Sequence, residues 1–430
     1  MDPGAGMNQL LNKLLSPSTC FVAVNCFCTF GSIAQYILFM RLFEFKDMGS
    51  ITYFHTIITL TGMTQIGLLN GGFRIFSQKT PWLEPRVNNT VFSFFGFIFL
   101  AALALLLFRV IMPGYANPFF VPAAIMAGCL TMMKTWLTNV KIAKSELTRL
   151  NWVNVITTCF SFLFFLMIPY GGVFSALLVV TSIPLTFCLF YLASDKKMRP
   201  VKFSFQKRTL LWILYFGFVP FLTGVMTMIN LEIGNLGIKL SIGEEELGKF
   251  TLVQLYTNCF MLIPNSITLI FYPKMFQAYA NRDQASMTKL CRRILLLDVL
   301  YVLCAVIGTL TVFPFVINLL FPKYHIALPF VYCVLPGLCM ATLFISVNMI
   351  LYVNLILKPV FIIYLCSVFL TIAGILIFHF SGIMSLSMMA VMKCFISVFI
   401  SLSIGFYCAI YNKKLRVRYS IINTRNNILL

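Results

Sequence analysis

Residues 94–108 read FFGFIFLAALALLLF, an uninterrupted apolar run without a charged side chain. With its flanking residues, the run is long enough to cross about 30 Å of hydrocarbon as an α-helix. A barrel strand would instead alternate apolar and polar residues. Because a lipid-facing backbone must satisfy its own hydrogen bonds, only helices and closed barrels span a bilayer. This stretch therefore predicts an all-α polytopic membrane protein.

The rest of the chain follows the same pattern. Of its 430 residues, 60% are hydrophobic and 10% are charged, whereas about a quarter of the residues of an average soluble domain are charged. We predict about twelve transmembrane helices, at 17–40, 48–72, 87–110, 118–140, 152–170, 173–193, 209–235, 248–273, 292–317, 328–352, 359–381 and 384–411.

The net charge of +20 fits a membrane topology. With both termini in the cytoplasm, most of the 32 Lys and Arg residues fall in cytoplasmic segments, as the positive-inside rule requires. Such segments also attract anionic lipid on the cytoplasmic side, and no nucleic-acid partner is expected. The N-terminus lacks the short apolar core and cleavage site of a signal peptide, so none is predicted.

An internal repeat organises the helices. KDMGSITYF (46–54) aligns with EELGKFTLV (245–253) at a shift of 199 residues, which superposes Gly49 on Gly248. Two loops with a Pro-x-Tyr turn, IMPGYANPFF (111–120) and LFPKYHIALPF (320–330), also correspond. Because each half has an even number of spans, the halves keep one orientation. The repeat therefore predicts two six-helix lobes related by a pseudo-twofold axis along the membrane normal.

This division sets the predicted domain boundaries. Alternating access, in which one lobe rocks against the other around a central cavity, is the default mechanism for such repeats. The predicted segments are an N-terminal cytoplasmic segment (1–16), an N-lobe (17–193), a basic cytoplasmic linker (194–208), a C-lobe (209–411) and a basic cytoplasmic tail (412–430).

Several stretches resemble a known family. RLFEFKDMGSITYF (41–54) and GLLNGGFRIFSQ (67–78) resemble the first two helices of Wzx-like polysaccharide flippases of the multidrug/oligosaccharidyl-lipid/polysaccharide exporter (MOP) superfamily. Three later stretches are similar to the pattern of the second half of the same family. They are NLEIGNLGIKLSIGEEELGKFTLV (230–253), YPKMFQAY (272–279) and LFPKYHIALPF (320–330). The resemblance covers nearly the whole chain, and it implies a MATE-like architecture.

The resemblance also implies a function. An O-antigen-type flippase moves an undecaprenyl-pyrophosphate-linked oligosaccharide across the bacterial inner membrane, with proton or sodium coupling and glycan polymerases as partners. One residue departs from the pattern, because the acid of helix 7, often Asp in the family, is Glu232 here. Glu232 is the candidate for ion coupling, and pairing with Lys239 is the alternative.

Cations in helices are the first candidates for binding a pyrophosphate. A charge inside a bilayer costs about 2.5–3.5 kcal/mol on insertion scales, so it faces the protein interior. Lys393 lies near mid-bilayer in its predicted helix, and Lys134 lies closer to the inner end of its own. Arg41 and Arg74 end helices 1 and 2 where the resemblance places arginines. Each has a structural alternative: an ion pair, snorkelling to the interface or a topological anchor.

Uncharged and acidic groups complete the candidate site. Asn235 and Gln254 are candidates for contacting sugar hydroxyls, although such amides also bond between membrane helices. The acids of GEEELGK (243–249) are expected in a solvated loop. Asp298, shortly after two arginines, is expected to pair with a local cation.

Other functions compete with this one. A cation-coupled multidrug exporter of the same superfamily is the main alternative, and it would favour a buried acid in the first lobe. A lipid II flippase and a membrane scaffold are two more. With scattered cysteines, three histidines and no recognisable nucleophile, nucleotide or metal motif, we expect no catalytic residues, no metal and no cofactor.

Overall fold

The computed structural model describes residues 17–77, 83–111, 119–195, 206–281, 283–354 and 356–428, and these residues contain helices and no strand. The predicted N-terminal segment 1–16, most of the linker 194–208 and most of the loop 111–120 lie outside them. The predicted tail does not begin as a separate segment at 412, because the last helix continues to Ile428.

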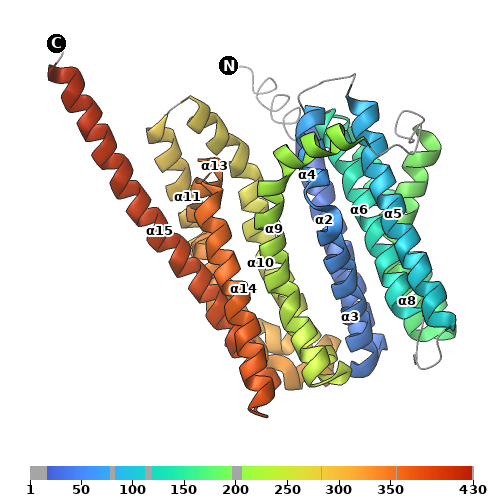
Figure 1. The fold of residues 1–430 in the computed structure, drawn as a ribbon. Helices are drawn as coiled ribbons and strands as arrows, with labels where there is room; N and C mark the ends of the chain where they lie inside the picture. Colours follow the sequence, from blue (N-terminus) through green and yellow to red (C-terminus); the bar gives the residue numbers. More distant parts are fainter. Residues whose placement is uncertain are drawn as a thin grey trace, which may run out of the picture. The chain divides into compact units, whose positions relative to one another are not determined.

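The chain divides into two compact units, residues 1–239 with 243–248, and residues 240–242 with 249–430. The first unit holds nearly all of the first ten helices (Figure 1). They are α2 (Pro17–Leu42), α3 (Phe45–Gly62), η1 (Met63–Gln65), α4 (Leu68–Ser77), α5 (Glu84–Ile111), α6 (Phe120–Ala143), α7 (Leu147–Leu163), η2 (Phe164–Met167), α8 (Ile168–Ser194) and α9 (Lys207–Ser241).

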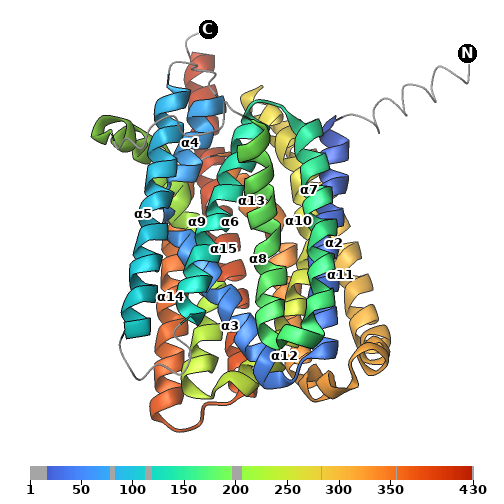
Figure 2. The same cartoon turned by 90° about the vertical axis from the view of Figure 1, so that its right-hand side faces the viewer.

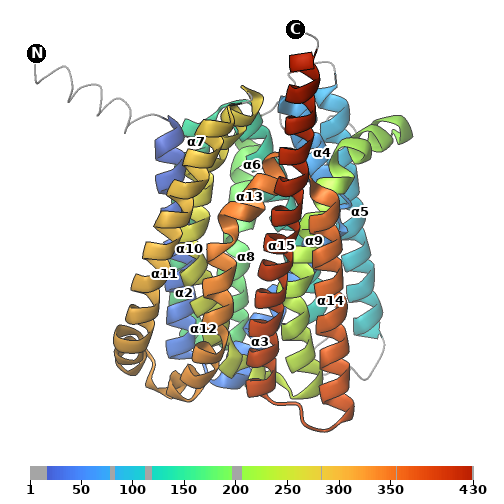
Figure 3. The same cartoon turned by 90° about the vertical axis from the view of Figure 1, so that its left-hand side faces the viewer.

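The second unit holds the rest of the chain, except for the first turn of its first helix. Its helices are α10 (Glu244–Ala280), α11 (Gln284–Leu320), η4 (Pro322–Ala327), α12 (Leu328–Leu343), α13 (Ile345–Val353), α14 (Leu357–Phe380) and α15 (Leu386–Ile428). In the first unit α2 packs on α7, α7 on α8, and α6 on α3, α5 and α8 (Figure 2). In the second, α15 packs on α12 and α14 (Figure 3).

The unit boundary differs from the repeat boundary. The repeat assigns helix 7, which is α9, to the second half, whereas the packing of α9 places it almost entirely in the first unit. The two divisions describe different things, because one follows sequence correspondence and the other follows contacts. The lobe boundaries at 193 and 209 therefore stay a prediction of the repeat.

Nine segments of the described chain are long and apolar enough to cross a membrane. One of them, Leu147–Ser194, has 48 residues and covers two of the predicted spans. The two predicted spans that do not meet the criteria are 48–72 and 248–273, which correspond to the broken helix α3–α4 and to α10. Both carry more polar residues than the others, so apolarity alone does not find them.

Two predicted helices are interrupted. The span 48–72 is broken after α3, where Ile66 and Gly67 have positive φ angles of 51° and 89°. Gly67 also lies against α9, since an added Cβ atom would be 2.8 Å from the Gly217 backbone. The span 328–352 is divided into α12 and α13 at Phe344. The apolar pattern showed neither break, because it continues through both.

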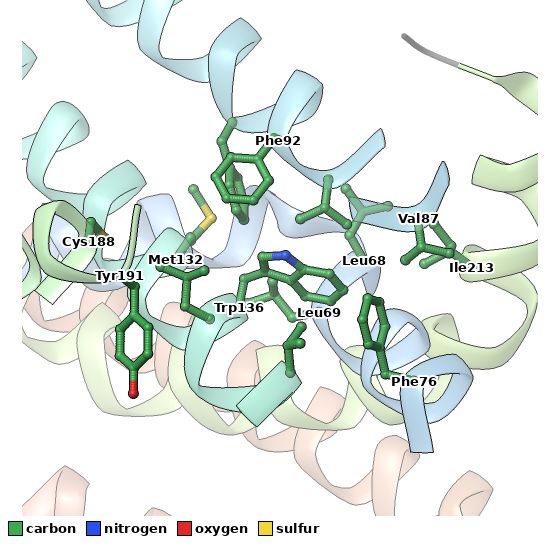
Figure 4. Close-up of a cluster of buried hydrophobic side chains, with 14 of the residues drawn as sticks. Leu68, Leu69, Phe76, Val87, Phe92, Met132, Trp136, Cys188, Tyr191 and Ile213 are labelled. Carbon is green, nitrogen blue, oxygen red and sulfur yellow. The ribbon is translucent and has the colours of Figure 1, made fainter. Parts of the chain in front are cut away.

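Trp136 lies at the centre of the core of the first unit (Figure 4). Its ring is fully buried and meets Phe76 edge-on at 5.4 Å, and its Nε1 donates a hydrogen bond of 2.9 Å to Asn88 Oδ1. Gly72 packs directly against the indole ring, where a side chain would overlap it. Side chains from α4, α5 and α6 are thereby held together around one aromatic residue.

A buried lysine forms two ion pairs at one end of the first unit. Lys141, which is 1% exposed, pairs with Glu146 at 2.5 Å and with Asp195 at 2.6 Å. Neighbouring Lys144 pairs with Glu84 at 2.6 Å and is partly exposed. These lysines connect the end of α6 to the residue before α7, to the residue after α8 and to the start of α5.

Replacing Lys141 by Met leaves two carboxylates without their cation, so we expect Lys141→Met to lower stability by about 3 kcal/mol, near the lower end for a broken buried ion pair. Lys144→Met is the matched control, and its half-exposed pair is worth at most about 1 kcal/mol. Thermal unfolding of the purified full-length variants measures both. Equal losses in the two variants would contradict a special role for Lys141.

Candidate functional site

The helix α9 lies against the broken helix α3–α4 through glycines. An added Cβ atom on Gly71 or Gly217 would overlap backbone atoms of the facing helix, at Ile213 and Gly67 respectively. Small residues let membrane helices approach this closely, and the gain is van der Waals packing. The contact brings the polar side chains of α9 next to those of α3.

A second pair of glycines joins the beginnings of α3 and α10. A Cβ atom on Gly49 would overlap the carbonyl oxygen of Glu244, and one on Gly248 would overlap that of Phe45. The two contacts are related by the 199-residue shift of the repeat, since Phe45 corresponds to Glu244 as Gly49 does to Gly248. The local pseudo-twofold axis of the repeat therefore passes between these two helix ends.

Charged and polar groups surround this glycine contact. Lys239 forms an ion pair with Glu244 and lies 4.9 Å from the centroid of the Tyr53 ring. The Ser50 hydroxyl donates a hydrogen bond of 3.1 Å to the same carboxylate. The expectation of a solvated acidic loop was wrong, because Glu244, Glu245 and Glu246 form the first turn of α10. Carboxylates are favourable there, next to the positive end of the helix dipole.

Glu232 is the centre of a polar cluster between α3 and α9. Its Oε2 accepts hydrogen bonds from Thr56 Oγ1 at 2.7 Å and from Asn235 Nδ2 at 2.9 Å. Asn235 follows Glu232 by one turn and also lies 3.3 Å from the Thr56 hydroxyl. Thr56 is completely buried and Asn235 nearly so. Thr56 and Asn235 are neutral donors, and Lys239, the alternative partner of Glu232, pairs with Glu244 instead.

Two aromatic side chains lie close to this cluster. Tyr36 of α2 meets His55 of α3 edge-on at 6.1 Å between ring centroids. His55, which is exposed, immediately precedes Thr56 in α3. The cluster thus combines a carboxylate, an amide, a hydroxyl and two aromatic rings, which can bind a cation or the hydroxyls of a sugar. Thr56 was not among the predicted residues, since a threonine in an apolar helix carries no distinguishing signal.

The predicted cations of the first unit lie apart from one another. Arg41 is exposed in the last turn of α2, next to the start of α3. Arg74 is exposed at the other end of the α3–α4 pair, with its guanidinium 5.1 Å from the Phe216 ring centroid. Lys134 is half-buried on α6, and its Nζ lies 5.5 Å from the Phe187 ring centroid on α8. Within the described residues it forms no ion pair.

The remaining two predicted residues belong to the second unit. Lys393 of α15 is half-buried, with its Nζ 5.7 Å from the ring centroid of buried Phe250 on α10. Gln254 follows Phe250 by one turn, so it lies on the same face of α10. A lysine and an amide are therefore neighbours on this helix pair. No group of three or more His, Cys, Asp or Glu that could hold a metal is found in the described part of the chain.

Enlarging either repeat-related glycine should separate α3 from α10. We expect Gly49→Ala and Gly248→Ala each to lower stability by about 1–3 kcal/mol, the usual cost of overpacking. Gly62→Ala is the matched control on α3, where an added Cβ atom meets nothing within 4 Å. There the substitution should be neutral or stabilising by about 1 kcal/mol. Thermal unfolding decides the matter, and variants as stable as Gly62→Ala would refute the close contact.

Comparison with known proteins places the fold. No family model matches the sequence, and no curated protein matches it. Among solved structures, an inward-facing multidrug resistance MATE family transporter of the MOP superfamily superposes with a TM-score of 0.70 at 12% identity, covering 90% of this chain and 95% of that one. The lipid II flippase MurJ superposes with a TM-score of 0.65 at 12% identity, covering 90% and 87% respectively.

A third neighbour is a MOP superfamily transporter from Pyrococcus furiosus described as having a binding pocket of reverse polarity. Its TM-score is 0.58 at 13% identity, and the match covers 93% of this chain and 94% of that one. The chain is therefore a multi-pass membrane protein with the fold of MOP superfamily transporters, and the predicted fold class is confirmed.

Proposed function

We propose that this protein flips an undecaprenyl-pyrophosphate-linked oligosaccharide across the bacterial inner membrane by alternating access. The observation that carries the proposal is a lysine in a membrane-spanning helix of each unit, Lys134 and Lys393, each half-buried beside an aromatic ring. A cation in such a helix costs free energy on insertion, so it is retained for a partner. A pyrophosphate is an anionic partner that must cross the hydrocarbon, and aromatic rings beside the cation suit the sugars attached to it.

The fold supports the same class of substrate. The solved neighbours include a flippase for lipid II, which is a lipid-linked molecule, and they are transporters rather than enzymes. Gln254 beside Lys393, and Asn235 beside Glu232, supply amides for sugar hydroxyls. In this proposal the polyprenyl tail stays in the bilayer while the polar headgroup passes through the protein.

Glu232 is the proposed coupling residue for a proton or a sodium ion. The donors Thr56 and Asn235 stabilise its carboxylate without neutralising it. Substitution by Gln keeps the shape but removes the exchangeable charge. We therefore expect Glu232→Gln to abolish the dependence of flipping on an imposed ion gradient in proteoliposomes, while Gln65→Glu, on the same broken helix as Thr56, leaves it intact. A gradient dependence that survives Glu232→Gln would remove Glu232 from coupling.

The proposed location is the inner membrane, with both termini in the cytoplasm and glycan polymerases as partners. Exposed basic side chains lie at the helix ends assigned to the cytoplasm, where they attract anionic lipid. They are Arg74, Arg86, Arg208, Lys274, Lys289, Arg292, Arg293 and Lys358.

A multidrug exporter is the second candidate, and one observation favours it. Glu232 is a carboxylate that packs within the first unit, and an exporter of cationic drugs would use an acid of that kind. A MATE family transporter is also among the neighbours. The lysines distinguish the two candidates, because a cationic drug would be repelled by Lys134 and Lys393 whereas a pyrophosphate would be attracted.

The experiment that tests the flippase uses cells lacking this protein. Undecaprenyl-linked sugars are extracted, and the membrane face that they occupy is determined after complementation. We expect complete repeat units to accumulate on the cytoplasmic face, and wild type and Lys358→Ala to relieve the accumulation. Lys393→Ala should leave it, because the pyrophosphate loses its cation. Lys358 is the matched control, since it is exposed at the start of α14.

The opposite result is also informative. Normal glycan export in the deletion strain, together with new sensitivity to cationic drugs, would replace the flippase by the multidrug exporter. Full relief by Lys393→Ala would keep the flippase but remove Lys393 from the substrate path.

A further inference from the structure

Asp298 of α11 is a buried acid that the proposed transport mechanism does not yet use. Asp298 is 0% exposed, and neither of its carboxylate oxygens has a hydrogen-bond partner. Within the described residues it takes part in no ion pair. The expectation that it pairs with a local cation is therefore wrong. Arg292 and Arg293, the arginines that suggested it, are exposed on another side of α11.

An ionised carboxylate cannot remain in such a place at low cost. Moving it from water to an apolar interior without a partner costs several kcal/mol or more, and buried carboxyls instead become neutral by taking a proton. We propose that Asp298 binds a proton in this conformation and exchanges it with water when the α10–α11 contact loosens during transport. The inference deepens the proposed function and rests on it for the transport cycle in which the contact loosens. Proton binding by Asp298 does not depend on the substrate.

The position of Asp298 along α11 is fixed by its neighbours. Ile294 and Val302, one turn before and after it, are also buried, and Ile294 packs in a cluster with Met275 of α10. Further along α11, the Tyr301 hydroxyl donates a hydrogen bond of 2.6 Å to the carbonyl oxygen of Phe260. The two helices run in opposite directions at this contact, so Asp298 lies level with the residues of α10 between Phe260 and Met275.

A proline of α10 lies in that interval. Pro264 is buried and has no N–H group, so the Phe260 carbonyl one turn earlier lacks its helical donor. The Tyr301 hydroxyl supplies the missing hydrogen bond, and it is therefore not directed to Asp298. Helices bend most easily where a proline interrupts their hydrogen bonds. The acid thus lies at the part of the α10–α11 contact that opens at the lowest cost.

The groups around Asp298 favour a proton over a metal cation. The charged side chains of α10 and α11 nearest to Asp298 in the sequence of these helices, Lys274, Lys289, Arg292 and Arg293, are exposed. The other ionisable side chains on the packed elements include phenols and thiols: Tyr272 and Cys259 on α10, Tyr301 and Cys291 on α11, Cys339 on α12 and Tyr352 on α13. Asn348 of α13, whose neighbour Met349 belongs to the cluster of Ile294, has a side-chain oxygen without a hydrogen-bond partner. One acid among such groups is too few for a sodium or divalent site, which needs several oxygen ligands.

The exchange conserves charge and atoms. The Asp298 carboxylic acid releases H⁺ to water that enters along α10 near Pro264, and the resulting carboxylate takes H⁺ back before the contact closes. No oxidant, reductant or other reactant is required. A cycle of this kind carries one proton per opening if the two exchanges face opposite sides of the membrane.

Infrared spectroscopy of the purified full-length protein tests both steps without a substrate. A protonated buried acid has a carboxylic C=O band, which we expect at neutral pH in wild type and in Asp283→Asn and not in Asp298→Asn. Asp283 is the matched control on the same helix. It is exposed and caps α11 through the Ser286 N–H at 2.9 Å, which holds the pKa of its carboxyl below the ordinary value, and Asn is an equally good cap.

Transfer to D₂O tests the exchange. We expect the band to shift in wild type, because the acid meets solvent when the contact opens, and to shift several-fold more slowly in Pro264→Ala, which restores the donor to Phe260. If Asp298→Asn does not fold, Asp298→Glu assigns the band by moving it. A spectrum unchanged by Asp298→Asn overturns protonation, and a band that never shifts in D₂O overturns exchange. If wild type shows both features but flips no lipid-linked sugar, the proposed function fails and the proton site stands.

Discussion

The close approach of α3 and α10 at Gly49 and Gly248 determines how the charged groups at the start of these helices are arranged. Because neither residue has a side chain, Gly49 lies against the backbone of Glu244 and Gly248 lies against the backbone of Phe45. This approach puts the Glu244 carboxylate beside Ser50, and Lys239 pairs with the same carboxylate. A larger residue at either position would push the two helix ends apart and disturb these contacts of Glu244. The repeat supplies the symmetry of the contact, since both glycines occupy the same position of their halves.

Charge placement follows from the same constraint. Lys239 and Lys141 are neutralised by carboxylates at the ends of their helices, so they serve the fold. Glu232 and Asp298 form no ion pair in the described part of the chain, although both lie in membrane-spanning segments. An acid in that position is costly unless its protonation changes with the environment. The difference between paired and unpaired charge therefore separates structural groups from functional candidates more clearly than burial does.

The sequence predicts the fold better than the site. Apolar runs such as 94–108 determine the helices, and the 199-residue shift shows that Gly49 and Gly248 correspond, but neither pattern says that each glycine lies against the backbone of the other helix. Thr56 could not be found, because its contact with Glu232 spans 176 positions of the chain. The Asp298 prediction failed for a geometric reason. Residues five and six positions apart point to different sides of a helix, so Arg292 and Arg293 face away from the acid.

In the proposed function, the sign of the charges that line the path selects the substrate, because the fold alone does not. The solved neighbours share the architecture at 12% identity, although one is a multidrug resistance transporter and another a lipid II flippase. In this chain a lysine on α6 and another on α15 lie beside aromatic rings, whereas the acids lie on α9 and α11. The two half-buried lysines and the two acids without an ion pair thus lie on different helices. That separation suits a transporter in which one set of groups binds an anionic headgroup while the other set takes and releases protons, because neither set then neutralises the other.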